Sequence, residues 1–251
     1  MIKFWNIKAK TYPKPFDIKN IKNTYNILEK IKKLGISFKN KTLIDIGCGT
    51  GIYGLVLVRE AKKVFCLDFS KKMISTLREE ARKNDIANID SRIVSFQNFR
   101  IDGMEKEFDI SFASMTPAIK TIEDVIKMEK LCKEFCVFIG WAGKRENYIA
   151  DEIMAAHNIK PFYPKGFFDV REILIKRKKN FKQKIFETSW VWEGQIEDAI
   201  EDFSARIELE NIEPNKKLIK NILISKFPDG NISMETSATE GILVWKPSMM
   251  R

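Results

Sequence analysis

The stretch Leu43-Ile44-Asp45-Ile46-Gly47-Cys48-Gly49-Thr50-Gly51 decides the fold of this 251-residue chain. Its first four residues form a short apolar run, which is typical of a strand buried on both faces of a parallel sheet. Three glycines follow at alternate positions, and glycine permits both left-handed backbone and the close approach of a ligand. The sequence therefore predicts a strand that ends in a tight loop. An acid at Asp45, between two isoleucines, would be costly to bury without a partner.

Two glycine patterns overlap in this loop. Gly49-Thr50-Gly51-Ile52-Tyr53-Gly54 satisfies G-x-G-x-x-G, the dinucleotide fingerprint, and Asp68 lies where that fingerprint places a ribose-binding acid. In the dinucleotide fingerprint, however, the strand runs almost directly into the first glycine. Here the apolar run stops at Gly47, two residues too early. The register therefore fits Asp-x-Gly-x-Gly-x-Gly, and no G-x-x-x-x-G-K-[ST] phosphate loop occurs.

Short apolar runs alternate with amphipathic helices along the rest of the chain. We expect strands at 42–46, 63–68, 91–96, 108–114, 136–141 and 184–192, and a last one ending at 241–245. We expect helices at 18–34, 52–61, 70–83, 122–131, 146–157, 195–210 and 215–225, with a basic helix before residue 184 and a proline- and aromatic-rich loop at 161–168. This alternation predicts an α/β fold with a doubly wound, mostly parallel sheet.

The segments 45–51 and Leu67-Asp68-Phe69-Ser70 resemble the first two motifs of class I, Rossmann-like S-adenosylmethionine-dependent methyltransferases of the bacterial small-molecule type. The resemblance covers residues 41–141 well and the closing strands loosely. It implies a seven-stranded sheet whose last strand is antiparallel, in a single domain over 1–251. Within that domain we expect a helical entry segment (1–40), a core (41–192 and 231–251) and a helical lid insertion (193–230).

The resemblance also implies which residues hold the cofactor, S-adenosyl-L-methionine. The backbone of Gly47, Cys48, Gly49 and Gly51 would approach its methionyl part, with the carboxylate at the N-terminus of a helix starting near residue 52. Asp45 would face the ammonium group, directly or through water. Asp68, followed by Phe69, would accept hydrogen bonds from the ribose hydroxyls.

The third and fourth motifs match the family less closely. Where many members carry an acid that contacts adenine, this chain has Ser95, followed by Phe96, which would either stack on adenine or belong to the core. Ser114-Met115-Thr116-Pro117 stands where enzymes that methylate nucleic-acid amino groups carry Asn/Asp-Pro-Pro-Tyr/Phe, or is simply a strand-ending turn. The mismatch disfavours base-amino methylation and favours a small-molecule acceptor.

The acceptor pocket is predicted from position in the fold. Ser114 is expected at the cofactor, while Thr116, Trp141 and Tyr12 are expected to border the acceptor, with Trp141 alternatively a core residue. Because the methyl group of a sulfonium is already activated, a catalytic base is optional. The candidates for one are Tyr12 and His157, the single histidine; His157 would otherwise cap the C-terminus of its helix.

The charge balance leaves a second interpretation open. The chain has 44 basic and 34 acidic residues, a net charge of +10, and its densest basic run is 176–184. Solvated lysines explain such a run, but an RNA or protein methyltransferase that uses it as a docking patch is the alternative. A nicotinamide-dependent oxidoreductase and a non-enzymatic cofactor-binding protein are further alternatives.

The remaining composition limits the class of protein. One histidine and four cysteines without zinc spacing predict no metal site, and the thiols are expected to be reduced. No apolar run reaches 18 residues and the N-terminus lacks a signal-peptide pattern, so a cytoplasmic protein without a membrane partner is expected. The oligomeric state and the methylated atom do not follow from the sequence.

Overall fold

The computed structural model of the chain describes residues 1–160 and 165–248. The chain divides into two compact units. The glycine-loop unit comprises Pro13–Ala142, Lys165–Ile185 and Glu240–Arg251, and the helical unit comprises Met1–Tyr12, Gly143–Pro164 and Phe186–Thr239. A single domain over 1–251 requires the two units to fold as one, and it stays a prediction.

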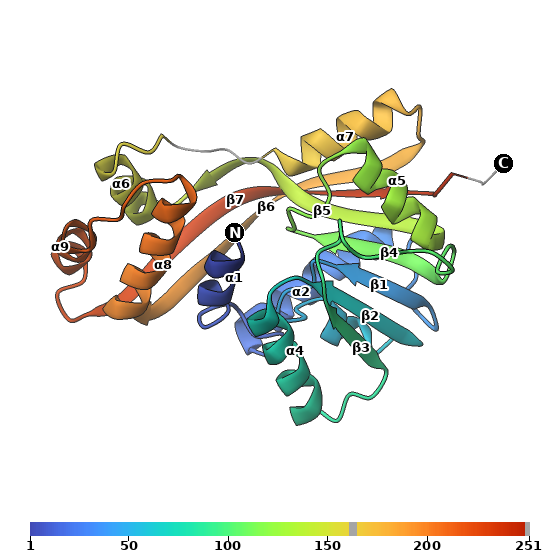
Figure 1. Ribbon diagram of the computed structural model, residues 1–251, viewed down its shortest axis with the longest axis horizontal. Helices are drawn as coiled ribbons and strands as arrows, with labels where there is room; N and C mark the ends of the chain where they lie inside the picture. Colours follow the sequence, from blue (N-terminus) through green and yellow to red (C-terminus); the bar gives the residue numbers. More distant parts are fainter. Residues whose placement is uncertain (161–164, 249–251) are drawn as a thin grey trace. The chain divides into compact units, whose positions relative to one another are not determined.

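A seven-stranded sheet has the order β3-β2-β1-β4-β5-β7-β6. Its strands are β1 (Thr42–Ile46), β2 (Lys63–Asp68), β3 (Ile89–Ile93), β4 (Phe108–Ser114), β5 (Cys132–Glu146), β6 (Phe181–Gln195) and β7 (Asn231–Trp245) (Figure 1). The first five strands pair in parallel. The predicted doubly wound, mostly parallel sheet with an antiparallel last strand is confirmed, and β7 lies between β5 and β6 in the order.

The register of the central strands positions the candidate site. Ile46, at the end of β1, lies opposite Leu67 of β2 on one side and Ala113 of β4 on the other. The carboxyl ends of three strands therefore meet at one edge of the sheet. The chain turns into the glycine loop at this edge, which is where ligands bind in parallel α/β sheets.

Nine helices are found among the described residues. They are α1 (Ile2–Lys8), α2 (Ile18–Lys33), α3 (Gly54–Leu57), α4 (Lys71–Lys83), α5 (Ile122–Leu131), α6 (Tyr148–Ala156), α7 (Gly166–Lys176), α8 (Ile196–Leu209) and α9 (Lys216–Lys226). Ser70 caps α4 as predicted, because its hydroxyl accepts the Met73 N–H at 3.2 Å. Thr121 and Asp124 form a reciprocal capping box at the start of α5. No helix in this part of the chain combines the length and apolarity needed to cross a membrane.

Each unit has its own hydrophobic core. In the glycine-loop unit, α5 and α7 cover one face of the sheet, where Met128, Phe167 and Trp245 pack together (Figure 1). In the helical unit, α6, α8 and α9 pack on β7, with Phe203 and Leu223 fully buried. Both cores follow the alternation of apolar and polar residues along their strands and helices.

Several predicted boundaries are wrong. The predicted helix 52–61 contains only four regular residues, α3, because i→i−3 hydrogen bonds such as Arg59 N–H to Val56 O interrupt the helical pattern. Strand β3 starts and ends earlier than expected, because pairing with β2 ends at Ile93 and Ser95 begins a turn. Strand β5 continues to Glu146, and α7 already begins at Gly166. Residues 161–164 of the predicted proline-rich loop lie outside the described residues.

Candidate active site

The glycine loop folds back over the end of β2. Gly47, Gly49 and Gly51 have φ values of 70°, 55° and 86°, in the left-handed region that favours glycine. The N–H groups of Gly47 and Cys48 both donate to Leu67 O, at 2.7 and 3.0 Å. A Cβ at Gly47 would lie 2.0 Å from the Thr116 hydroxyl oxygen, so this position admits no side chain. The loop therefore presents bare backbone at the carboxyl edge of the sheet.

Asp45 is a buried acid with unused hydrogen-bonding capacity. It lies on β1, its side chain is almost completely buried, and its Oδ2 has no hydrogen-bond partner among the described residues. Burial, and then the nearby charge of Asp68, raise the pKa of Asp45 to about 7, although the Gly54 N–H opposes this shift by donating to the carboxylate. A buried carboxylate of this kind calls for a further donor or a cation at Oδ2, which the described residues do not supply.

Asp68 closes the loop from the end of β2. Its Oδ2 accepts the Gly49 N–H at 3.0 Å, and its Oδ1 accepts the Ser70 N–H at 2.7 Å. Burial raises the pKa of Asp68, and these backbone donors partly offset that effect. Each carboxylate oxygen can accept more than one hydrogen bond. The carboxylate is therefore held rigidly while it keeps capacity for further donors such as hydroxyl groups.

The end of β4 faces the same loop. The Ser114 Oγ is buried without a hydrogen-bond partner in the part of the chain that the structure describes. Met115 adopts a left-handed conformation with φ 49°, which is uncommon for a residue with a side chain and occurs often at functional sites. The Thr116 side chain then lies against Gly47, and its hydroxyl accepts the Ala118 N–H at 3.2 Å. Four predicted positions, Asp45, Gly47, Ser114 and Thr116, thus come together.

The structure gives the other predicted cofactor residues different surroundings. Phe96 is 3% exposed and belongs to the core under α5, where Lys127 Nζ lies 4.9 Å from its ring centre. This is the core alternative for Phe96, and the stacking role finds no support. Ser95 is half-buried, and its hydroxyl accepts the Asn98 N–H at 3.3 Å. Phe69 and Trp141 are also half-buried. Cys48, in the glycine loop, is buried, and burial raises the pKa of its thiol well above the usual value.

The two candidates for a catalytic base lie in the helical unit. Tyr12 is half-buried beside Trp5, with ring centres 6.2 Å apart. His157 ends α6, where its Nδ1 is 2.8 Å from Ile153 O and its Nε2 accepts the Asn215 N–H at 3.1 Å. This partner set requires a neutral ring whose Nδ1 carries the proton. Both ring nitrogens therefore join α6 to the start of α9, which favours a structural role for His157.

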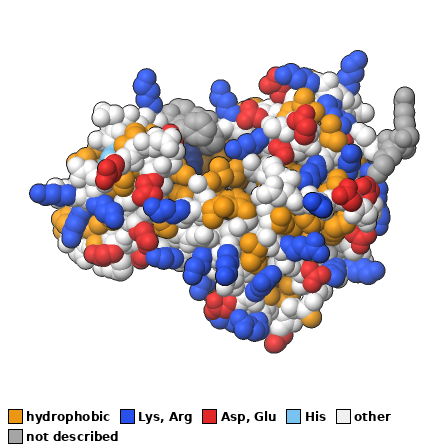
Figure 2. Space-filling model, viewed as in Figure 1, with side chains coloured by type: hydrophobic (Ala, Val, Ile, Leu, Met, Phe, Trp, Pro, Cys, Tyr) orange, Lys and Arg blue, Asp and Glu red, His pale blue; other side chains and the backbone are white. Residues whose placement is uncertain are grey.

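The basic run 176–184 is largely engaged within the protein. Arg177 and Lys179 pair with the buried carboxylate of Glu129, which also accepts the indole N–H of Trp245. Lys176 pairs with Glu172 one helical turn away, and Lys182 donates to Leu34 O. Figure 2 shows basic side chains interspersed with acidic ones over the visible face. The geometry therefore favours a structural role for this run.

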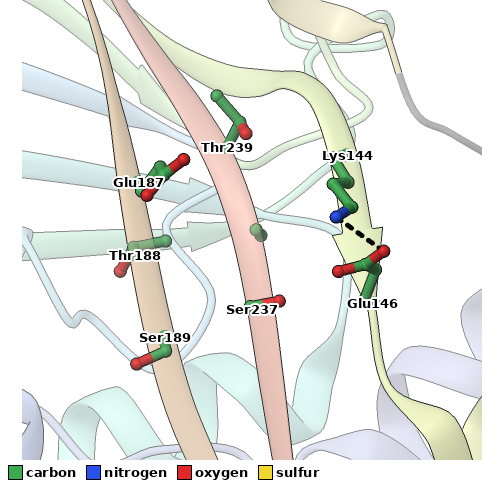
Figure 3. A pocket seen from close by; sticks show the side chains of 8 residues that line it. Lys144, Glu146, Glu187, Thr188, Ser189, Ser237 and Thr239 are labelled. Atoms are coloured by element: carbon green, nitrogen blue, oxygen red, sulfur yellow. Dashed lines mark ion pairs between the residues drawn. The ribbon is translucent and has the colours of Figure 1, made fainter.

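Sequence reasoning missed a group of cations in the helical unit. Lys8 and Arg206 form ion pairs with Asp202, and the charge of Asp202 also acts on Arg145. The segments that carry these residues are far apart in the sequence, so no local motif predicts their contacts. An open hollow in the same unit lies across β5, β6 and β7, and Lys144, Glu146, Glu187 and Thr239 are among its lining residues (Figure 3). Its lining is mostly hydroxyl and charged groups, as on a solvated sheet face.

A family model described as a methyltransferase domain matches residues 37–223. The chain belongs to the methyltransferase domain family. The matched range contains the glycine loop, Asp68 and the whole of the edge described above. This methyltransferase uses S-adenosyl-L-methionine as its methyl donor, and the predictions of enzyme class and cofactor are confirmed.

The relatives of this chain align with different shares of its length. An uncharacterized RNA methyltransferase from Clostridium tetani is 30% identical over 82 residues, which are 33% of this chain and 18% of that protein. A ubiquinone biosynthesis O-methyltransferase from Pelagibacter ubique is 27% identical over 211 residues, 74% of this chain and 85% of that protein. The chain therefore spans less than a fifth of the first relative and most of the second.

A solved structure supports the fold. Phosphoethanolamine N-methyltransferase 2 from Haemonchus contortus, in complex with S-adenosyl-L-methionine, superposes with a TM-score of 0.56 at 15% identity. The match covers 98% of this chain and 57% of that one. At this identity the likeness concerns the fold alone.

Proposed function

We propose that this methyltransferase holds S-adenosylmethionine at the glycine loop and transfers its methyl group to a small-molecule acceptor. The observation that carries the cofactor site is the carboxylate of Asp45, which is buried, lacks a partner at Oδ2 among the described residues and lies beside the bare loop backbone. A cation that also donates hydrogen bonds, such as an ammonium group, offsets the cost of a buried carboxylate. The cofactor's amino-acid part carries such a group.

Each residue at this edge has a separate part in the proposal. Asp45 would bind the ammonium, the loop from Gly47 to Gly51 would receive the methionyl backbone, and Asp68 would accept from the ribose hydroxyls. The acceptor capacity that Asp68 keeps beyond its backbone donors suits the hydroxyl groups of a ribose. The cofactor supplies an activated methyl group on sulfur, so the protein's task is to align the acceptor and exclude water.

Two observations support a small-molecule acceptor. The relative named for ubiquinone biosynthesis aligns with 74% of the chain, whereas the relative named for RNA aligns with 33%. In the basic run 176–184, the docking patch of the RNA alternative, Arg177 and Lys179 form ion pairs with Glu129. Ser114, whose hydroxyl oxygen has no partner in the described chain, is placed to contact the cofactor or the acceptor.

A methyl-transfer screen tests this function. Purified protein is incubated with methyl-labelled S-adenosylmethionine and, separately, with a metabolite panel of phenols, amines and carboxylic acids, with total RNA, and with an unfractionated protein pool. We expect label to enter at least one small molecule and the Asp68→Asn variant to lose at least tenfold in rate. Label that enters only RNA or only protein would refute the small-molecule acceptor.

A further inference from the structure

Three buried side-chain oxygens in the glycine-loop unit lack a hydrogen-bond partner among the described residues. They are Asp45 Oδ2 on β1, Ser114 Oγ at the end of β4 and Glu240 Oε2 on β7. The proposed cofactor site makes no use of Glu240, although this residue is only 6% exposed. Burying a carboxylate without partners is costly. Glu240 therefore lacks the contacts that would offset its burial.

Glu240 lies on the face of the sheet that points away from α7. Side chains alternate along a strand, and the next residue, Gly241, faces α7. A Cβ at Gly241 would lie 2.3 Å from the ring of Phe167, at the start of that helix. Glu240 points to the other face, in line with the buried residues Ile242 and Val244. The alternation along β7 thus places an acid where the two following positions carry aliphatic side chains.

Ser114 shares this face with Glu240. It pairs with Ile139 of β5, and paired residues of neighbouring strands point to the same side of a sheet. The residue after Ile139, Gly140, faces α7, because a Cβ there would lie 2.8 Å from the backbone nitrogen of Phe167. Ile139 and Ser114 therefore face away from α7, as Glu240 does.

The three residues also lie toward one edge of the sheet. Asp45 pairs with Phe112, two residues before Ser114, so it shares the face, and both acids of this set and the serine follow the strand ends. Within the glycine-loop unit β5 ends at Ala142 and β7 begins at Glu240. Because β7 is antiparallel, its beginning lies beside the carboxyl ends of the parallel strands. All three unpartnered oxygens thus belong to the edge that carries the glycine loop.

The separation of these residues suits one small ligand. The strands follow one another in the order β1-β4-β5-β7 (Figure 1). Neighbouring strands are about 4.8 Å apart, so β4 and β7 are about 10 Å apart. Ligand pockets of roughly 300–1,000 Å³ are about as wide. A single ligand can therefore extend from Ser114 to Glu240.

Glu129 shows how this chain satisfies a buried acid that has a structural role. Its carboxylate, in a residue 3% exposed, accepts hydrogen bonds from Arg177 and from the indole of Trp245, and its pKa is lowered despite burial. Glu240 differs in both respects. Its Oε2 has no partner in the described chain, and burial raises its pKa to about 7, although the charge of Lys30 opposes this shift.

We infer that Glu240 binds a hydrogen-bond-donating group of the methyl acceptor, an amino or a hydroxyl group. The identification of the ligand as the acceptor rests on the proposed function, which places the cofactor at Asp45 and the glycine loop. Ser114 stands between the cofactor and Glu240 in the strand order. The acceptor then extends from the end of β4 across β5 to β7. An anionic group is excluded at Glu240, because an ionised carboxylate repels it.

Calorimetric titration with three probes of similar shape tests the site. Protein saturated with S-adenosylhomocysteine is titrated with benzylamine, benzyl alcohol and benzoate, which are at neutral pH a cation, a neutral hydroxyl compound and an anion. The amine or the alcohol should bind saturably, with one site per chain. Tighter binding of benzylamine identifies an amino group on the acceptor, and tighter binding of benzyl alcohol identifies a hydroxyl group.

The variant Glu240→Gln keeps the size of the side chain and removes its charge. It should weaken binding of the preferred probe at least fivefold and change the S-adenosylhomocysteine affinity less than twofold. The matched control is Glu235→Gln, which alters an exposed acid on the same strand and should change probe binding less than twofold. Circular dichroism checks the fold of each variant, and Glu240→Ala replaces Glu240→Gln if the latter does not fold.

Four results would overturn the inference. They are the absence of saturable binding of both the amine and the alcohol, tighter binding of benzoate than of either, unchanged probe affinity in Glu240→Gln, and an equal loss in Glu235→Gln. Titration of the ligand-free protein with S-adenosylhomocysteine and with each probe separates the two proposals. Probe binding without S-adenosylhomocysteine binding would contradict the proposed cofactor site, and the reverse would contradict the role of Glu240.

Discussion

At the scale of single residues, the site depends on an acid and a glycine that the sequence places two positions apart. The sequence identified Asp45 and Gly47 by register alone, and the structure shows one reason for each. Asp45 is buried with an unsatisfied oxygen, and Gly47 touches Thr116 where any side chain would collide. The contact with Thr116 could not be predicted, because it depends on the left-handed turn at Met115.

Replacing Asp45 by asparagine should change how stability depends on pH. The pKa of Asp45 is raised from 3.8 to about 7 in the folded protein, so the folded state holds the proton more tightly than the unfolded chain. The free energy of unfolding of the wild type therefore falls as pH rises from about 4 to about 7. The Asp45→Asn variant has no carboxylate to ionise at this position, so its stability does not fall in this way. At pH 8 its free energy of unfolding should exceed that of the wild type by on the order of 1–3 kcal/mol.

Urea unfolding of the ligand-free wild type and Asp45→Asn at pH 5, 6, 7 and 8 measures this effect. The difference between the two proteins should shrink steadily toward acid pH. In parallel, S-adenosylhomocysteine should raise the melting temperature of the wild type more at pH 8 than at pH 6, because an ionised Asp45 attracts the ammonium group. A stability difference that does not vary with pH would show that Asp45 does not titrate in this range.

Gly47→Ala should disrupt the site, and Gly103→Ala provides a matched control. Both glycines have φ near 70°, so both substitutions cost about 1 kcal/mol in backbone strain. A Cβ at Gly103 meets nothing within 4 Å, whereas a Cβ at Gly47 meets Thr116. Gly47→Ala should therefore lose S-adenosylhomocysteine binding at least tenfold and Gly103→Ala should keep it. Equal affinities in a calorimetric titration would argue against the close contact.

At the scale of elements, helix ends and strand extensions decide where the polar residues go. The sequence predicted β1, β2, β4 and α5 to the residue, because their apolar patterns are unambiguous. It did not predict how far β5 and β6 extend, because the residues in these extensions are largely polar and lack the apolar run of a buried strand. The surroundings of His157 were hidden for a similar reason: its two partners, Ile153 O and Asn215 N–H, are backbone groups brought together by the fold.

His157→Ala should therefore affect stability and not chemistry. The substitution removes two hydrogen bonds that join α6 to the start of α9, and the free energy of unfolding should drop by about 1–3 kcal/mol. S-adenosylhomocysteine affinity, measured by calorimetry at a temperature where the variant is folded, should stay within twofold of the wild type. Loss of methyl transfer in a variant of unchanged stability would restore His157 as a candidate base.

Glu129 should be the acid on which α5, α7 and the C-terminal segment depend. Arg177 and Lys179 pair with its carboxylate, and Trp245 and Ser248 also donate to it. Despite the cost of burial, these partners lower the pKa of Glu129, so its contribution to stability is present above about pH 4.5 and is lost as pH falls through the lowered pKa. Glu129→Gln should cost about 3 kcal/mol at pH 7.

The control for this change is Glu172→Gln, which removes an exposed pair with Lys176 one turn apart on α7. Exposed pairs of this kind contribute little to stability, because solvent screens the two charges. Thermal unfolding at pH 7 and pH 4 should show a large difference between the two variants at pH 7 and a smaller one at pH 4. Similar melting temperatures for both variants at pH 7 would mean that the Glu129 network is no stronger than a surface pair.

At the scale of the whole molecule, the sequence specifies the sheet and the cofactor edge better than it specifies the acceptor. The alternation of strands, loops and helices and the spacing of the glycines are both local features of the sequence. The fold of residues 41–141 could therefore be predicted. The ion pairs of Lys8 and Arg206 with Asp202 instead join α1 to α8, two helices that lie far apart in the sequence. Such contacts between distant segments become visible only when the chain is folded.

The central claim, that Asp68 and the glycine loop hold the cofactor, is tested most directly by calorimetric titration of the wild type and Asp68→Asn with S-adenosylhomocysteine. We predict one site per chain with micromolar affinity in the wild type. We predict at least tenfold weaker binding in Asp68→Asn, because the ribose hydroxyls lose a charged acceptor. No binding heat in the wild type, or equal affinity in the two proteins, would contradict the account.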